Sequence, residues 1–152
     1  MNRYRETAEK MFLEGYSCSQ SVFLTFSEIL GVDAETAVAL SAPFGGGMGQ
    51  LREVCGAVSG MFLSLGALYG PLLPGETEKK ANLYRDIQML ARSFEERNGS
   101  IICRELLGIS GRSDPVPGSR TADYYASRSS CRKRIGDAAE IFGDYLEKKG
   151  RL

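Results

Sequence analysis

Residues 54–69 constrain the fold more than any other part of this 152-residue chain. Their side chains are apolar or small on every side of a helix, and a helix without a polar face belongs in a protein core. The segment is shorter than the roughly 20 apolar residues that a helix needs to span a bilayer. We therefore predict a buried central helix, with Gly56, Gly60, Ser64 and Gly66 allowing neighbouring helices to approach its backbone closely.

The rest of the chain also has helical periodicity, and no stretch shows the alternation of a β-strand. We predict a single all-α domain over residues 1–152, a bundle of about six to seven helices around the central one. Capping residues such as Ser17 and Asp33, and breakers such as Pro43, set the boundaries. The predicted helices cover residues 2–14, 18–30, 34–42, 54–69, 77–97, 101–107 (capped by Ser100) and 131–149, the last starting at residue 123 at the earliest. A glycine run at 45–49 and a loop at 108–120 complete the chain.

Four cysteines carry the functional argument, because the chain has no histidine. The four, each at a predicted helix start, are Cys18, Cys55, Cys103 and Cys131. A helix N-terminus carries partial positive charge, which favours the thiolate, the form that attacks disulfides and binds metals. We therefore expect the four to cluster at one end of the bundle and to act together as catalytic residues, although they are far apart in the sequence.

Cys55 is the predicted most activated thiol, because it follows the glycine run at the mouth of the central helix. The alternative is a packing residue, since free cysteine is among the most buried residue types. Burial raises a thiol pKa, whereas the helix dipole and amide hydrogen bonds lower it. We expect the dipole and the hydrogen bonds to dominate if the glycine loop leaves the sulfur reachable, and burial to dominate otherwise. Cys131 has four cations between residues 128 and 134 around it, which also lower a thiol pKa but are equally typical of a solvated helix end.

The glycines at 45, 46, 47 and 49 are candidate binding residues for a cofactor or an anion. No Lys-Ser/Thr follows Gly45, Gly46, Gly47 and Gly49, and neither a strand nor an acidic residue completes a dinucleotide fingerprint, so both nucleotide motifs are excluded. A hinge or a close-packing role is the alternative. The lack of histidine excludes Ser-His-Asp and Cys-His couples and any histidine-containing metal site.

Charge and the N-terminal segment bear on partners and location. Lys plus Arg and Asp plus Glu are both 19, so the formal net charge is zero and no overall field attracts nucleic acid or an anionic membrane. The first residues have no apolar signal core. We expect a cytoplasmic protein, where thiols are kept reduced, with no nucleic-acid partner and no membrane insertion. The sequence allows a homo-oligomer.

Five sequence features occur in a fixed order. They are GYSCSQSV (15–22), FGGGMG (44–49), CGAVSG (55–60), CRELLG (103–108) and Cys131. This pattern resembles the four-cysteine redox-active proteins of bacteria and archaea labelled C_GCAxxG_C_C, although the chain reads Cys-Gly-Ala where the label reads Gly-Cys-Ala. The resemblance implies a small helical protein with four functional cysteines and a redox role. It implies no substrate.

Three functions remain open from the sequence. The leading hypothesis is thiol–disulfide chemistry, in which one thiolate attacks an electrophile and a second cysteine resolves the intermediate; the partner is an unidentified redox protein or a small-molecule electrophile. The first alternative is a tetrathiolate site, in which Cys18, Cys55, Cys103 and Cys131 hold zinc or an iron–sulfur cluster. The second is a helical interaction module with structural cysteines. Four cysteines permit three disulfide connectivities, and the sequence does not choose among them.

Overall fold

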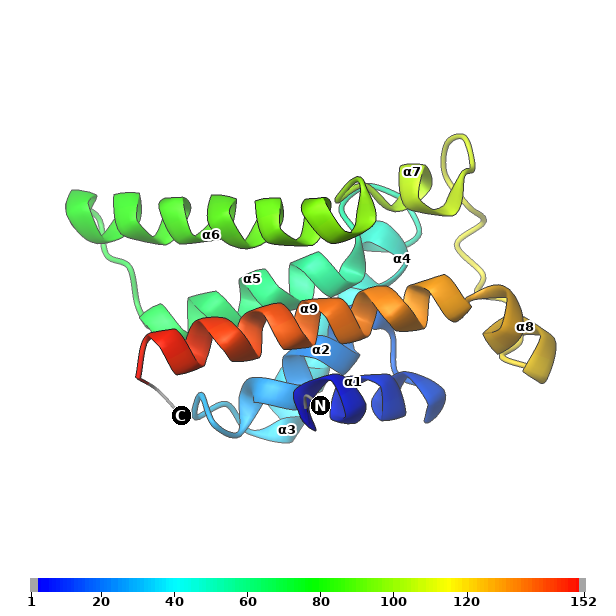
Figure 1. Ribbon diagram of the computed structural model, residues 1–152, viewed down its shortest axis with the longest axis horizontal. Coiled ribbons are helices and arrows are strands. Elements are labelled where there is room, and N and C mark those ends of the chain that lie inside the picture. Colours follow the sequence, from blue (N-terminus) through cyan, green and yellow to red (C-terminus); the bar gives the residue numbers. More distant parts are fainter. Residues whose placement is uncertain (1–2, 151–152) are drawn as a thin grey trace.

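The computed structural model describes residues 3–150, and within this range the chain is helical with one isolated β-bridge (Figure 1). The predicted all-α class is confirmed. The elements are α1 (Arg3–Leu13), α2 (Cys18–Ser27), α3 (Ala34–Ser41), the 3₁₀ helix η1 (Ala42–Phe44), α4 (Gly45–Met48), α5 (Gly56–Tyr69), α6 (Thr77–Asn98), α7 (Cys103–Leu107), α8 (Ala122–Ser127) and α9 (Ser129–Lys148). Asn2, the predicted first residue of the first helix, lies outside the described residues.

Helix α5 is the buried central helix that the sequence predicts, and it contacts α2, α6 and α9. A Cβ atom added to Gly60 would lie 2.7 Å from Cβ of Val22, and Gly56 meets α2 in the same way one turn earlier. Ser64 is fully buried and donates a hydrogen bond of 2.8 Å to the carbonyl oxygen of Gly60. Gly66 is exposed and faces open space, so its predicted packing role is wrong.

Local capping signals account for the helix starts. Ser17 and Gln20 form a complete capping box at α2, and the carboxylate of Asp33 accepts a hydrogen bond from Thr36 N at α3. Ser100 differs from its predicted role, because Ile102 is the N-cap of α7 and the Ser100 hydroxyl instead accepts a hydrogen bond from Ile102 N.

The predicted C-terminal helix is interrupted at Arg128, which ends α8 and precedes α9. Thr121 caps α8 by accepting a hydrogen bond from Tyr124 N. Helix α8 therefore projects from the end of α9, as Figure 1 shows at its right-hand side. Within residues 3–150 no helix combines the length and the apolar character needed to cross a membrane.

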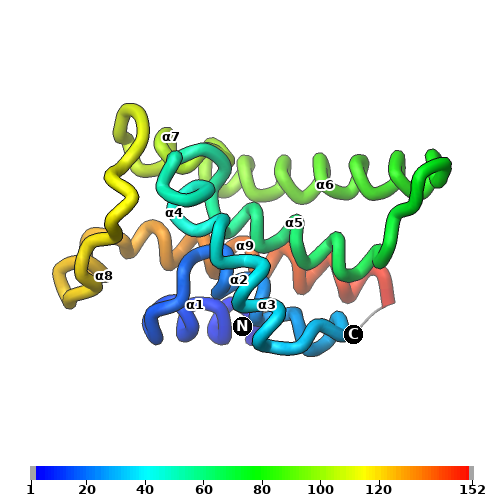
Figure 2. The backbone as a smooth tube through the Cα atoms, turned by 180° about the vertical axis from the view of Figure 1, so that it is seen from behind, coloured from blue at the N-terminus to red at the C-terminus, as the bar shows by residue number. Residues whose placement is uncertain are grey.

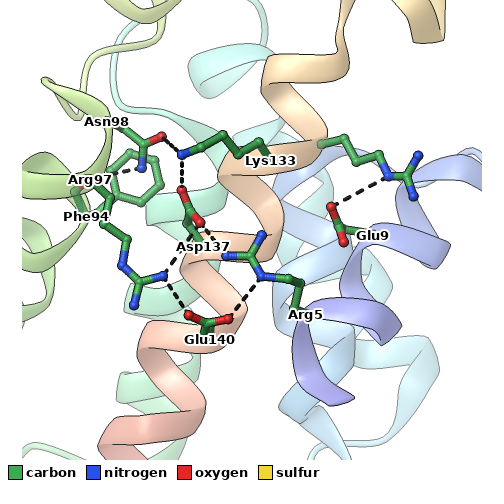
Figure 3. Close-up of polar contacts among 9 residues, drawn as sticks. Arg5, Glu9, Phe94, Arg97, Asn98, Lys133, Asp137 and Glu140 are labelled. Atoms are coloured by element: carbon green, nitrogen blue, oxygen red, sulfur yellow. Dashed lines mark hydrogen bonds and ion pairs between the residues drawn. The ribbon is translucent and has the colours of Figure 1, made fainter. Parts of the chain in front are cut away.

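A buried carboxylate joins α1, α6 and α9 (Figure 3). Asp137 is 3% exposed, and it pairs with Arg5, with Lys133 at 2.7 Å and with Arg97 at 3.6 Å. Glu140, one turn along α9, bridges Arg5 at 3.0 Å and Arg97 at 2.9 Å. Burial alone would raise the pKa of Asp137, but the hydrogen bonds from Lys133 and Arg5 outweigh it and the pKa is lowered. This network fixes α9, and with it the position of Cys131 near the start of α9.

Candidate functional site

All four cysteines line one cavity of about 470 Å³ at one end of the bundle. In Figure 1 the starts of α5 and α9, with α4 and α7, lie at the right-hand end, and Figure 2 shows the same end from behind. The four free thiols in the cavity are Cys18, Cys55, Cys103 and Cys131. The predicted clustering is confirmed.

A short antiparallel pairing holds Cys55 and Cys103 in place. Val54 and Ile102 form a β-bridge, and Cys55 N donates a hydrogen bond of 2.8 Å to the carbonyl oxygen of Ile101. In this register Cys55 and Cys103 are diagonal neighbours on one face of the pairing. Both are buried, with exposed fractions of 7% and 8%. The predicted start of the central helix at residue 54 is therefore two residues early, because residues 54 and 55 pair with the segment before α7.

The glycine run, which includes the short element α4, is a turn with left-handed backbone angles rather than a regular helix. Every residue from 46 to 50 has a φ between 59° and 69°, and Arg52 follows at 60°. Glycine adopts this conformation freely, whereas Met48, Gln50 and Arg52 each do so at a cost of roughly 1–2 kcal/mol. Strained backbone of this kind persists where the surrounding structure enforces it, often at functional sites.

The glycines of this turn make close contacts. A Cβ atom at Gly47 would lie 2.6 Å from Cβ of Cys103, and one at Gly45 would lie 2.8 Å from Cβ of Ser17. Gly45, Gly46 and Gly47 line the cavity, whereas Gly49 is not among its lining residues. The close-packing role is thus observed, and a binding role for these glycines stays a prediction.

The left-handed turn places Arg52 inside the cavity wall, where it is 8% exposed. Its Nε donates to the Ser113 hydroxyl at 2.8 Å, and its Nη2 donates to Oε1 of Gln50 at 3.0 Å. Its Nη1 donates to Sγ of Cys103 at 3.6 Å. Sequence reasoning missed Arg52; the available signal was a cation three residues before Cys55, next to the glycine run.

Cys18 and Cys131 form the accessible pair, since both are partly exposed. The Cys18 thiol donates a hydrogen bond to the Cys131 sulfur, and this bond is the largest cause of a Cys131 pKa of about 6. Burial opposes the shift, while Arg134, Arg128 and Arg52 add to it. The pKa of Cys18 is raised well above its usual value, because Cys18 keeps the proton of this bond and because the protein around the partly exposed sulfur removes water from it. The two sulfurs thus share one proton at neutral pH.

The pKa of Cys55 is shifted in the opposite direction to that of Cys131. Burial raises its pKa to about 12, and the hydrogen bonds from the backbone amides of Ala57 and Val58, which lower the pKa, are too weak to compensate. The prediction that Cys55 is the most activated thiol is therefore wrong. Its helix start is present, but the desolvation of the thiolate is the larger effect.

The four cations between residues 128 and 134 divide into two groups. Arg128 and Arg134 line the cavity. Lys133 binds Asp137 (Figure 3). Arg132 pairs with Glu9 at 3.6 Å, so these two cations stabilise the helix packing instead.

Comparison with known proteins agrees with this arrangement. A family described as "Putative redox-active protein (C_GCAxxG_C_C)" matches residues 16–145, which include the four cysteines and the glycine run. The chain belongs to this family. No curated protein and no solved structure matches the chain.

The four cysteines of this C_GCAxxG_C_C protein share a cavity without forming a ready metal centre. Over residues 3–150, no group of three or more Cys, His, Asp or Glu side chains is placed to hold a metal ion. A tetrathiolate site for zinc or an iron–sulfur cluster would require the sulfurs to converge on one point. That alternative therefore needs a rearrangement of the cavity, whereas the Cys18–Cys131 contact exists as the structure stands.

Proposed function

We propose that this redox-active protein carries out thiol–disulfide exchange, with Cys131 as the attacking thiolate and Cys18 as the resolving thiol. The supporting observation is that Cys131 and Cys18, both partly exposed, lie together in one cavity, where the Cys18 thiol and nearby arginines lower the pKa of Cys131. A lowered pKa raises the thiolate fraction at pH 7 above the few per cent of a free cysteine. The scheme suits a compartment that keeps thiols reduced, such as the cytoplasm.

The proposed reaction has two exchange steps. The Cys131 thiolate attacks one sulfur of a substrate disulfide, and the other sulfur leaves as a thiolate that takes a proton from water. Cys18 then attacks the Cys131 sulfur of the mixed disulfide, which forms a Cys18–Cys131 disulfide and releases the second substrate thiolate. The substrate gains two electrons and the protein loses two. A partner dithiol returns the protein to the reduced state by the reverse exchange.

The raised pKa of Cys18 fits the order of these steps. Its largest cause is the hydrogen bond to the Cys131 sulfur. Once Cys131 is part of a mixed disulfide it carries no negative charge, so that cause disappears and Cys18 loses its proton more readily. Cys18 is thus held as a thiol until Cys131 has reacted. Cys55 and Cys103 supply a second dithiol in the same cavity, which can reduce the Cys18–Cys131 disulfide by exchange.

The test follows the reaction of the reduced protein with bis(2-hydroxyethyl) disulfide by intact-mass and peptide mass spectrometry. We expect Cys131→Ser to abolish the fast reaction at pH 7. We expect Cys18→Ser to accumulate the mixed disulfide on Cys131, because no resolving thiol remains. Cys103→Ser is the matched control and keeps the first step.

Two outcomes would overturn the proposal. One is an unchanged reaction rate in Cys131→Ser. The other is stoichiometric zinc or iron in anaerobically purified protein that is lost in every single cysteine variant, which would favour the tetrathiolate alternative.

A further inference from the structure

The cavity beside the cysteines has an excess of positive charge that the chain as a whole lacks. Among the residues that the structure describes, four arginines line it, Arg52, Arg120, Arg128 and Arg134, and Asp114 is the one lining carboxylate. The whole chain has 19 cations and 19 anions. The positive charge is therefore concentrated locally, and the single Cys131 thiolate offsets only part of it.

These four arginines also lack carboxylate partners. Among residues 3–150 none of the four lies within 4.0 Å of a carboxylate oxygen, whereas Arg132 on the same helix pairs with Glu9. Arg134 donates a hydrogen bond to the carbonyl oxygen of Leu106. Arg120 donates to the carbonyl oxygens of Phe12, in the last turn of α1, and of Tyr16, which follows α1. Neutral carbonyl groups thus hold the guanidinium groups of Arg120 and Arg134 in position without neutralising them.

Arg52 makes the strongest case, because it is buried. Arg52 lines the cavity, and three of its five N–H donors bind the Ser113 hydroxyl, the Gln50 amide oxygen and the Cys103 sulfur. The other two donors have no acceptor among the described residues. A buried charge is costly unless it is paired. The guanidinium fork matches a carboxylate with two parallel hydrogen bonds.

From these observations we infer that the cavity binds a low-molecular-weight disulfide that carries carboxylate groups, with Arg52 and Arg134 as carboxylate-binding residues beside Cys131. A volume of about 470 Å³ fits a small-molecule ligand. Leu106, Leu107 and Val116 give the same cavity apolar walls for the carbon chain. The inference rests on the proposed thiol–disulfide function, and it adds the substrate class.

The positive charge also solves a kinetic problem. A dicarboxylate disulfide and the Cys131 thiolate repel each other, so without nearby cations the anionic substrate would react more slowly than a neutral one. A positively charged cavity reverses this order, since clefts of one sign raise association rates by roughly 10- to 1,000-fold for ligands of opposite sign.

The test compares three disulfides of similar size that differ in charge: 3,3′-dithiodipropionate (anionic), bis(2-hydroxyethyl) disulfide (neutral) and cystamine (cationic). The readout is the ratio of the anionic to the neutral rate constant for Cys131. Replacing an arginine near Cys131 also changes the thiolate fraction of Cys131. That change affects both rate constants equally, so it cancels in the ratio. At low ionic strength we expect a ratio of about ten or more, a cystamine rate below the neutral one, and a ratio that falls towards one as salt is added.

The variants assign the effect to the cavity. Arg52→Gln and Arg134→Gln should each lower the anionic-to-neutral ratio by about threefold or more, in line with the loss of a charge-assisted hydrogen bond. Arg132→Gln removes the same charge from α9 outside the cavity and should leave the ratio within about twofold of the wild type. The dicarboxylate adipate, which has no sulfur, should protect Cys131 from alkylation in the wild type and not in Arg52→Gln.

The outcomes separate the two claims. If Cys131 reacts with none of the three disulfides, the proposed function fails, and adipate protection alone then decides whether the cavity binds carboxylates. If the neutral disulfide reacts at least as fast as the anionic one, and adipate does not protect, the substrate class is wrong while the exchange chemistry stands. Equal loss of the ratio in Arg132→Gln would also overturn the inference, because the effect would then come from overall charge.

Discussion

Cys131 and Cys55 both lie at helix starts in the same cavity, yet their pKa values are shifted in opposite directions. Cys131 has a pKa of about 6, with a thiol donor beside it and arginines nearby. Cys55 has a pKa of about 12, with only backbone amides to offset its burial. A helix N-terminus is therefore insufficient to activate a thiol. Partial exposure, neighbouring cations and a hydrogen-bond donor decide the outcome.

The difference divides the work within the cavity. The partly exposed pair, Cys18 and Cys131, can meet a substrate and holds one thiolate at neutral pH. The buried pair, Cys55 and Cys103, is enclosed by the left-handed turn and by the pairing between the segments before α5 and α7.

The largest effect is expected from Gly47→Ala, which disturbs the buried pair. The new Cβ would lie 2.6 Å from Cβ of Cys103, at a φ of 66°. Left-handed strain and overpacking together should lower the free energy of unfolding by roughly 2–5 kcal/mol. Gly49→Ala is the matched control: it has the same backbone conformation, with its nearest contact at 3.8 Å, and should lose only about 1–2 kcal/mol. Urea unfolding of the reduced proteins measures the free energy of unfolding of both variants. An equal loss in the two would show that the contact with Cys103 does not contribute to stability.

The second prediction uses pH to separate the pairs. The folded pKa of Cys131 is depressed, so its contribution to stability is present above the unfolded thiol pKa of about 8.5 and is lost as pH falls towards 6. The folded pKa of Cys55 is raised, so its contribution is present below about pH 8.5 and is lost as pH rises towards 12. The stability difference between wild type and Cys131→Ala should therefore rise from pH 6 to pH 8.5. The difference between wild type and Cys55→Ala should fall above pH 8.5.

Urea unfolding at a series of pH values in reducing buffer gives both differences, and titrations common to wild type and variant cancel. Cys18 does not cancel in the Cys131→Ala difference, because its raised pKa depends on Cys131, but it adds a pH dependence only above about pH 8.5. If both stability differences changed with pH in the same direction, the pKa values of Cys131 and Cys55 would not be shifted in opposite directions.

The smallest effect is expected from Arg134→Gln, which removes one of the cations that lower the Cys131 pKa. The pKa should move towards that of an ordinary thiol, and the alkylation rate of Cys131 at pH 6 should drop by roughly two- to fivefold. Cys55 should be unaffected, because Arg134 is not among the causes of its shift. Arg132→Gln serves as the control on the same helix. A drop of equal size in that variant would assign the effect to overall charge rather than to the cavity.

Local sequence signals predicted much of the fold. The capping box at Ser17, the cap at Asp33 and the apolar stretch of residues 54–69 each act within a few residues of chain, and each appears in the structure. The clustering of the cysteines followed from the same kind of signal, since each marks a helix start.

The electrostatics of the site depend on tertiary structure and could not be predicted in the same way. The pairing of residues 52–55 with 101–104 buries Cys55, and no local pattern indicates it. The left-handed turn turns Arg52 inwards, although a chain of mixed glycine and larger residues rarely adopts this conformation. Which cations near Cys131 face the cavity is decided by Asp137 and Glu9, which bind Lys133 and Arg132. Local sequence predicts where helices start, but it does not predict which residues are buried or which charged groups they contact.

The central claim is the difference between Cys131 and Cys55, and site-resolved alkylation tests it most directly. Reduced, metal-free protein is treated with iodoacetamide from pH 5 to pH 10, and each cysteine is followed by peptide mass spectrometry. The structure predicts that Cys131 reaches half of its maximal rate near pH 6, and that Cys55 stays unmodified over this range until the protein is unfolded. Alkylation of Cys55 at a lower pH than Cys131 would contradict the account.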